Sequence, residues 1–278
     1  MAELTYTGYK DLVLTNDQFI ELYSDKRLTG IDFYENEYLI ARDQENNIVD
    51  KLCCHDGKLE RVQYAEFKNT YTGNLKPRNE HQELAFDMLK NTDVTIKLIT
   101  GTWGTGKTMA LVVAALEAVQ KGLFDRIIWI RNNVQVKDTD KLGALPGDEF
   151  EKLLPYLGPM MDHVGGEDGI HMLIQQKKLD VIPLAFLRGR SIRNSIIISS
   201  EAENLTKEHL QLLIGRVDTG SNLWLDADLR QRDRDIFEKS AGLETMINRL
   251  KGEKLFGYVH LIKSERSETA RLADKLND

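Results

Sequence analysis

Cysteine is scarce in this 278-residue sequence, which contains only Cys53 and Cys54. Neighbouring residues of a strand point to opposite faces of a sheet, so these two cysteines are predicted to be packing or surface residues. A chain without a disulfide framework is typical of a reducing compartment. We therefore expect a cytoplasmic protein.

Long apolar runs are also lacking, and none approaches the roughly 20 residues that a membrane-spanning helix needs. The first 14 residues, MAELTYTGYKDLVL, contain no basic segment followed by an apolar one. That order is the mark of a signal peptide. The sequence therefore predicts neither export nor a membrane partner.

Positive charge is in deficit, because 37 Lys and Arg residues face 44 Asp and Glu residues and give a net charge of −7. A protein that coats duplex nucleic acid is usually basic, so the balance disfavours that class. The net charge is still compatible with a channel or ring whose local charge differs from that of the whole protein. The six histidines are scattered, with no metal-ligand spacing to the cysteines, and we find no nucleophile motif.

Strand-like and helical segments alternate over most of the chain. The apolar, strand-like segments are VTIKLIT (94–100), RIIWIRN (126–132), LDVIPLAFL (179–187), NSIIISS (194–200), SNLWLDAD (221–228) and LFGYVHLIK (255–263). NSIIISS is almost wholly apolar, as expected of a central parallel strand. Helical segments separate these runs, which predicts an α/β fold whose parallel sheet is covered by helices on both faces.

A different pattern precedes this region. Three short strand-like runs, EYLIARD (37–43), NIVDKLCC (47–54) and LERVQYAEF (59–67), are separated by turn-forming residues. They predict a small β-meander. Residues 69–79, NTYTGNLKPRN, are rich in turn formers and are predicted to be a linker. We therefore divide the chain into an N-terminal extension with a small β-rich domain, 1–76, and a larger α/β domain, 77–278.

A glycine-rich loop joins the first strand of the larger domain to the helix that follows. Gly101, Gly106, Lys107 and Thr108 fit the P-loop (Walker A) pattern G-x-x-x-x-G-K-[ST]. Glycines let the backbone curl so that successive N–H groups point inward and cradle an anion, and the helix N-terminus adds positive potential. Lys107 would face the β- and γ-phosphates of ATP, and Thr108 would reach Mg²⁺. The predicted nucleotide contacts within the loop are Gly101, Thr102, Trp103, Gly104, Thr105, Gly106, Lys107 and Thr108.

Acidic residues follow two later strands. Glu201 and Glu203 come after NSIIISS, and Asp226, Asp228 and Gln231 come at and after SNLWLDAD. In a P-loop enzyme one carboxylate helps to hold the magnesium ion and another orients the attacking water. The carboxyl ends of parallel strands share one edge of the sheet, which predicts a single composite site. We expect Thr108, Glu201 and Asp228 to be the metal-binding residues.

Three arginines are further candidates. Arg188 and Arg190 in FLRGRS could contact phosphate, either on ATP or on a nucleic-acid backbone. Arg266, after the last strand, could stabilise the γ-phosphate in the transition state.

Taken together, several segments resemble the PhoH family of ATPases over roughly residues 77–270. They include NEHQELAFDML, TGTWGTGKT, LPYLGPMMD, PLAFLRGRSIRNSIIISSEAENLT, DADLRQ and KSERS. The resemblance implies a RecA-like P-loop core and assembly into rings, such as hexamers, of like subunits. By resemblance, Gln82 would lie near the adenine. Lys107, Glu201, Gln231 and Arg266 would be catalytic, with Glu201 as the acid, Gln231 as the γ-phosphate sensor and Arg266 as an arginine-finger residue.

The sequence departs from the family pattern at three positions. Ser200 stands where the family has an aspartate, Glu203 replaces a glutamine, and Ala227 replaces the glycine before Asp228. Serine cannot neutralise a magnesium ion, which predicts low turnover. We identify no segment like the PIN-type ribonuclease domain of some members, so the resemblance is to a stand-alone form, such as the phage-type members.

Two functions are compatible with these features. The first is an ATPase that couples hydrolysis to the remodelling of single-stranded RNA or DNA, as a helicase does. The alternative is a weakly hydrolysing, nucleotide-dependent switch or scaffold that acts through a protein partner. A small-molecule kinase would need an acceptor pocket and a lid, for which we find no motif.

Overall fold

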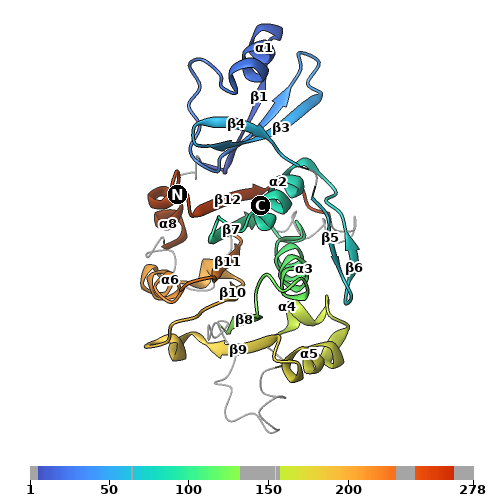
Figure 1. The fold of residues 1–278 in the computed structure, drawn as a ribbon, viewed down its shortest axis with the longest axis vertical. Helices are drawn as coiled ribbons and strands as arrows, with labels where there is room; N and C mark the ends of the chain where they lie inside the picture. Colours follow the sequence, from blue (N-terminus) through green and yellow to red (C-terminus); the bar gives the residue numbers. More distant parts are fainter. Residues whose placement is uncertain (1–5, 64, 132–153, 155–156, 230–241, 266–278) are drawn as a thin grey trace, which may run out of the picture.

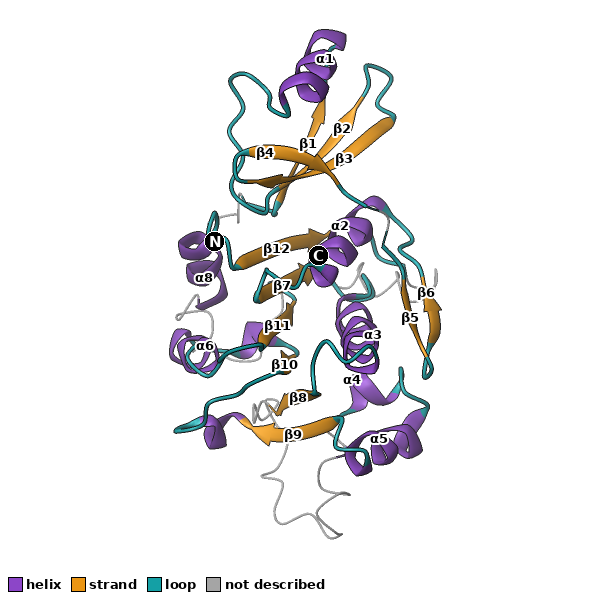
Figure 2. Cartoon of the chain, viewed as in Figure 1, coloured by secondary structure: helices purple, strands orange, loops and turns teal. Residues whose placement is uncertain are grey.

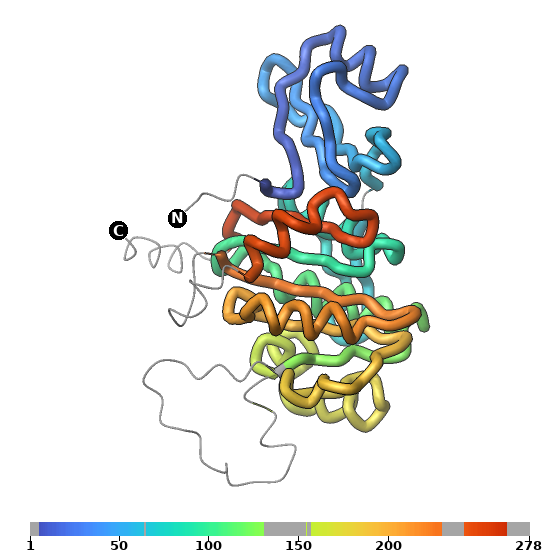
Figure 3. The backbone as a smooth tube through the Cα atoms, turned by 90° about the vertical axis from the view of Figure 1, so that its left-hand side faces the viewer, coloured from blue at the N-terminus to red at the C-terminus, as the bar shows by residue number. Residues whose placement is uncertain are grey.

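The computed structural model describes residues 6–63, 65–131, 154, 157–229 and 242–265. These residues form an elongated molecule with a small sheet at one end and a larger α/β unit beneath it (Figures 1 and 3). No helix in these ranges combines the length and apolarity that crossing a bilayer requires.

A six-stranded parallel sheet is the centre of the α/β unit. Its strands are β7 (Ile96–Gly101), β8 (Arg126–Arg131), β9 (Leu179–Pro183), β10 (Ser195–Ser199), β11 (Asn222–Ala227) and β12 (Phe256–Leu261). Their spatial order is β12-β7-β11-β10-β8-β9, and every pairing is parallel. The predicted α/β fold with a parallel sheet is thus confirmed.

Helices cover both faces of this sheet (Figure 2). One face is covered by α2 (Glu80–Lys90), α3 (Lys107–Gln120), α4 (Gly158–Met161) and α5 (Gly166–Gln175), and the other by α6 (Lys207–Ile214) and α8 (Gly242–Leu250). Short 3-10 turns, η2 (Leu184–Leu187) and η3 (Ala202–Asn204), follow β9 and β10. Alternate residues of β10 enter opposite apolar cores, with Ile196 and Ile198 facing α3 and Ile197 facing α6 and α8. Such two-sided burial is the reason that this strand is apolar at almost every position.

The N-terminal sheet contains the predicted meander. Strands β2 (Tyr38–Arg42), β3 (Ile48–His55) and β4 (Lys58–Arg61) pair antiparallel in sequence order. A fourth strand, β1 (Tyr9–Val13), pairs parallel with β2, and the helix α1 (Asn16–Asp25) lies between them in the chain. Cys53 and Cys54 lie in β3 as free, buried side chains, which confirms them as packing residues.

The predicted linker is wrong in part. Its first half belongs to a hairpin of β5 (Phe67–Asn69) and β6 (Gly73–Leu75). This hairpin packs on α3: the Lys68 N–H donates to the carboxylate of Glu117, and the Phe67 ring lies 4.8 Å from that of Phe86 in α2. Turn formers at its tip look like a linker in the sequence, whereas the contacts that stabilise the hairpin are with distant residues.

The boundary between residues 76 and 77 stays a proposal. The two sheets are separate hydrogen-bonded units. However, Tyr38, Ile40 and Cys53 of the N-terminal sheet belong to the same apolar cluster as Leu84 and Met88 of α2. The two units therefore share part of one core.

Candidate nucleotide site

The glycine-rich loop between β7 and α3 has the curled backbone that an anion cradle requires. Gly101, Gly104 and Gly106 have φ values of 154°, 73° and 86°, which side chains rarely permit. A Cβ on Gly101 would lie 2.5 Å from the carbonyl oxygen of Leu261 in the adjacent β12. Gly106 is the N-cap of α3, so the loop ends where the positive end of the helix begins.

Side chains of the loop hold it in this form. The fully buried Thr105 donates a hydrogen bond from Oγ1 to the carbonyl oxygen of Thr102 (2.9 Å). Lys107 Nζ donates to the carbonyl oxygens of Gly101 (2.8 Å) and Thr102 (2.9 Å). The ammonium group therefore lies across the loop, where it can meet the phosphates of a nucleotide.

Gln82 also supports the loop. It is 4% exposed, and its Nε2 donates to the carbonyl oxygen of Thr105 (3.0 Å). Its Oε1 accepts from the backbone N–H of Arg78 (2.8 Å). The resemblance implies a place near the adenine, and in the structure Gln82 lies in the wall of the cavity and joins α2 to the phosphate loop.

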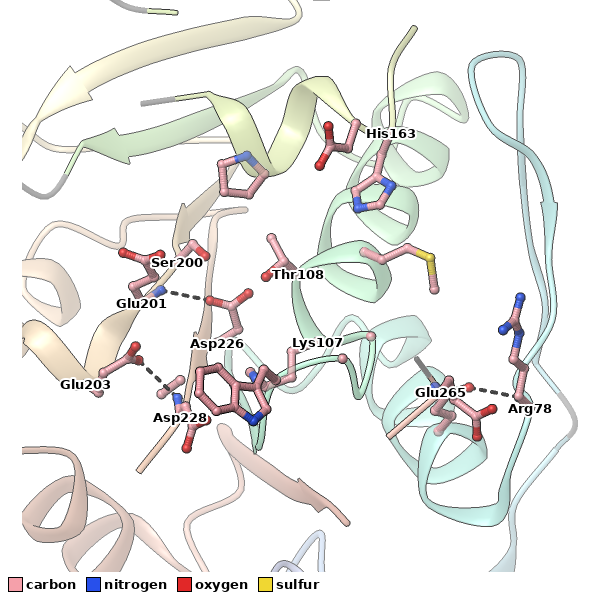
Figure 4. Close-up of a pocket in the computed structure, with 18 residues that line it drawn as sticks. Arg78, Lys107, Thr108, His163, Ser200, Glu201, Glu203, Asp226, Asp228 and Glu265 are labelled. Carbon is pink, nitrogen blue, oxygen red and sulfur yellow. Dashed lines mark hydrogen bonds between the residues drawn. The ribbon is translucent and has the colours of Figure 1, made fainter. Parts of the chain in front are cut away.

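A cavity of about 590 Å³ opens beside this loop. This is within the usual size range of small-molecule and cofactor sites. Its lining brings together four neighbouring strand ends, as the sequence predicts. The lining residues are Arg78, Gln82, Trp103, Gly104, Gly106, Lys107, Thr108, Met109, Pro159, Asp162, His163, Ser200, Glu201, Glu203, Asp226, Ala227, Asp228 and Glu265 (Figure 4).

Glu201 is exposed at the end of β10 and faces the cavity. Its φ of 55° lies in the left-handed region, which is uncommon for a residue with a side chain. Its backbone N–H donates to Oδ1 of Asp226 (2.9 Å), which fixes this turn against β11. Such backbone strain is characteristic of functional sites.

Glu203 and Asp228 are joined by a hydrogen bond, because Glu203 Oε2 accepts from the backbone N–H of Asp228 (3.0 Å). Burial raises the pKa of Glu203 to about 8, and the nearby carboxylates of Asp226 and Glu201 add to the shift. Glu203 is therefore protonated at neutral pH. A neutral carboxyl group resembles the side-chain amide of glutamine, the residue that Glu203 replaces in the family pattern.

The residues at this edge fit a magnesium-nucleotide complex. No three His, Cys, Asp or Glu side chains in the described parts of the chain converge to form a protein-only metal cage. Magnesium bound to a nucleotide does not need one, because it keeps several waters and uses phosphate oxygens with one or two carboxylates. Thr108 and the carboxylates of Glu201 and Asp228 line the cavity, so they could hold such an ion. When bound, it would neutralise charge on the phosphates.

Two predicted site residues, Gln231 and Arg266, lie outside the described residues. Conversely, the structure gives a place in the site to two residues outside our predicted catalytic, nucleotide-binding and metal-binding sets. Asp226, one of the strand-end acids noted in the sequence, is buried beside Ser200. Glu265 joins the site because its N–H donates to the Gly104 carbonyl oxygen (2.9 Å). Glu265 Oε1 also accepts from Asn79 Nδ2 (2.8 Å). An acid at a strand position buried on both faces, as Asp226 is, was the signal available in the sequence.

Comparison with known proteins agrees with this geometry. The family model of the PhoH-like protein matches residues 74–275. Protein PhoH2 of Bacillus subtilis is 31% identical over 98% of this chain and 64% of its own length, and protein PhoH2 of Mycolicibacterium smegmatis is 30% identical over 98% and 62%. A PhoH-like protein of Synechocystis is 33% identical over 69% of this chain and 58% of its own length. The chain thus spans less than two thirds of the length of each of these relatives.

The family match covers the phosphate loop, both acidic strand ends and the segment after β12. The resemblance noted in the sequence is therefore confirmed: this chain belongs to the PhoH-like protein family.

Proposed function

We propose that this protein binds ATP with Mg²⁺ and hydrolyses it, and that hydrolysis is coupled to the remodelling of single-stranded RNA or DNA. The observation that carries the proposal is the cavity that joins Lys107 and Thr108 of the phosphate loop to Glu201. Phosphoryl transfer needs a positive group on the phosphates, a metal ligand and an acid that orients water. Glu201 is the proposed acid, with Asp228 and Thr108 as the proposed metal-binding residues.

Gln231 as γ-phosphate sensor and Arg266 as arginine-finger residue remain part of this proposal. Both lie shortly after strands whose ends line the cavity, β11 and β12. The resemblance further suggests a ring of like subunits, in which an arginine could act on a neighbour's nucleotide. Sedimentation of the protein with and without ATP at micromolar concentration tests this assembly, and a monomer under both conditions would rule it out.

An exposed segment after β9 supports a nucleic-acid partner. The Phe186 side chain is 70% exposed, and Arg188 and Arg190 beside it are also exposed. Aromatic rings that stack on bases, next to arginines that bind phosphates, are the usual components of single-strand binding. The segment follows the carboxyl end of β9, at the edge of the sheet where the phosphate loop also lies.

The decisive experiment measures steady-state ATP hydrolysis with and without single-stranded RNA and DNA. The Glu201→Gln variant keeps the size of the side chain and removes its charge, so it should bind ATP without turning it over. Stimulation by either polymer supports the proposal. The second candidate is the weakly hydrolysing nucleotide-dependent switch, which is favoured by the serine at position 200 in place of the family's aspartate. Slow hydrolysis that neither RNA nor DNA stimulates would identify this switch.

The nucleic-acid surface is tested with Phe186→Ala. Loss of one stacking side chain is worth about 1–3 kcal/mol, so affinity for a single-stranded oligonucleotide should fall by about fivefold to 150-fold. Leu123→Ala is a matched control, because Leu123 is 58% exposed but precedes β8 at the opposite edge of the sheet. Equal affinities of the two variants would place the nucleic-acid surface elsewhere.

A further inference from the structure

We propose that Asp226 supplies the carboxylate that the magnesium shell would otherwise lack because of Ser200, an inference that rests on the proposed Mg-ATP site. In this chain the carboxylate would therefore come from the neighbouring strand β11 and not from the end of β10. Asp226 acts here as a metal-positioning residue, through water bound to the ion.

The sheet register places the two residues next to each other. Leu225 of β11 pairs with Ser199 of β10, and the residues that follow are Asp226 and Ser200. Trp224, two residues before Asp226, belongs to the apolar cluster that faces α3. Alternation along a strand puts Asp226 on this same face. Figure 4 shows its carboxylate between the end of β10 and the two P-loop residues Lys107 and Thr108.

The two oxygens of Asp226 differ in their contacts. Asp226 is 1% exposed, and Oδ1 accepts the N–H of Glu201 (2.9 Å). Oδ2 is buried and has no hydrogen-bond partner among the described residues. Buried polar atoms are nearly always paired, so one that is not calls for a water or an ion. Asp226 lines the cavity together with Thr108, so its carboxylate is suited to accept a hydrogen bond from magnesium-bound water.

The nearby acid Glu203 does not offer the same contact. Its Oε2 is occupied by the N–H of Asp228 (3.0 Å), which holds this carboxyl group against the turn after β11. On the neighbouring strand β11, Asp226 lies beside Ser200, and its carboxylate can therefore replace the negative charge that the serine does not provide.

The test measures metal affinity directly. Mn²⁺ is titrated into the protein in the presence of a non-hydrolysable ATP analogue, and free Mn²⁺ is followed by electron paramagnetic resonance. Asp226→Asn keeps an acceptor for the Glu201 N–H but removes the charge. We expect Mn²⁺ affinity to fall by about tenfold or more, as losses of outer-shell carboxylates do, while affinity for the analogue without metal stays as in the wild type.

The double variant Ser200→Asp with Asp226→Asn returns the charge to the end of β10. We expect it to recover most of the lost Mn²⁺ affinity, because the two positions are adjacent. Should Asp226→Asn fail to fold, the double variant decides alone: near-wild-type Mn²⁺ affinity supports the inference, and a folded double variant without Mn²⁺ binding overturns it.

Two results would reject the role of Asp226 and leave the proposed nucleotide site standing. One is wild-type Mn²⁺ affinity in Asp226→Asn, and the other is a folded double variant that recovers none of the lost Mn²⁺ affinity. Failure of the wild-type protein to bind the ATP analogue would instead reject the proposed nucleotide site. The two failures are therefore distinguishable in one set of titrations.

Discussion

Lys107 is the residue on which the proposed chemistry depends most directly. Its ammonium group donates to two carbonyl oxygens of the phosphate loop, so it is already held over the cradle. Lys107→Ala should reduce ATP hydrolysis by at least about a hundredfold, because it removes a charge that faces the developing negative charge. Steady-state phosphate release measures this loss of hydrolysis. Calorimetric titration should also show weaker ATP binding by the variant.

Lys121→Ala is the control for this variant. Lys121 lies at the other end of α3, where its exposed ammonium group pairs with the buried carboxylate of Glu117 (2.6 Å). Its removal should leave turnover unchanged. Wild-type turnover in Lys107→Ala would show that this loop is not the site of hydrolysis.

Glu203 is expected to tolerate one substitution and not another. In Glu203→Gln an amide oxygen can still accept the N–H of Asp228, so hydrolysis should stay within about threefold of the wild type. In Glu203→Ala that buried N–H loses the Glu203 acceptor, which costs about 1–3 kcal/mol and weakens the positioning of Asp228. Turnover and thermal stability should both fall in Glu203→Ala. Equal losses in the two variants would contradict a purely positional role for Glu203.

At the scale of elements, Lys97 links β7 to α2 through a buried amine. Its Nζ donates to the carbonyl oxygen of Leu89 (2.8 Å) near the end of α2 and lies 4.9 Å from the centre of the Trp224 ring. Burial lowers the pKa of Lys97 from 10.5 to about 7. Between these values the unfolded chain binds one more proton than the folded chain.

The free energy of unfolding should therefore rise with pH from about 7 upward, by about 1.4 kcal/mol per pH unit from this group. Lys97→Met removes the titration and keeps the bulk. The unfolding free energy of Lys97→Met minus that of the wild type should be constant below pH 7 and decrease above it, because only the wild type gains stability there. Denaturant unfolding of both proteins between pH 6 and about 9.5 measures this difference. The contributions of all other titrating groups are the same in both proteins and cancel. Parallel pH curves would mean that Lys97 is not buried as the structure shows.

The elements also show where sequence patterns succeed. Runs such as NSIIISS are predicted as strands because a strand buried on both faces must be apolar throughout. The hairpin of β5 and β6 is not predicted, because its three-residue strands have little pattern of their own. Its main support is the packing of Phe67 and the Lys68 N–H against helices far along the chain.

At the scale of the whole molecule, hydrogen bonds attach the N-terminal sheet to the backbone of β12 and of the residues just before it. The His260 N–H donates to the carbonyl oxygen of Thr7 (2.9 Å), and Asn36 Nδ2 donates to the carbonyl oxygens of Lys254 and Phe256 (both 3.0 Å). At Gly8 the two backbones approach so closely that a Cβ would lie 1.8 Å from the Tyr258 carbonyl oxygen.

Comparison of Gly8→Ala with a matched control should separate the steric overlap with β12 from the strain that alanine suffers at a positive φ. Gly30→Ala is the matched control, because its φ of 79° resembles the 84° of Gly8 while no atom lies within 4 Å of its Cβ position. Gly30→Ala should lose about 1–2 kcal/mol of unfolding free energy from strain alone. Gly8→Ala should lose about 1–3 kcal/mol more from overlap with β12. Denaturant unfolding of both variants measures the difference, and equal losses would argue against the close approach.

The sequence by itself determines the parallel α/β core, the phosphate loop and the strand ends that carry acids. These features depend on local rules: two-sided burial requires apolar strands, and a phosphate cradle requires glycines and a lysine at fixed spacing. Only the tertiary structure places β1 parallel to β2, the hairpin on α3, and Asp226 beside Ser200 with an unpaired buried oxygen. Each of these depends on which strand lies next to which. That order is set by the packing of residues far apart in the chain, for which no short stretch of sequence carries a signal.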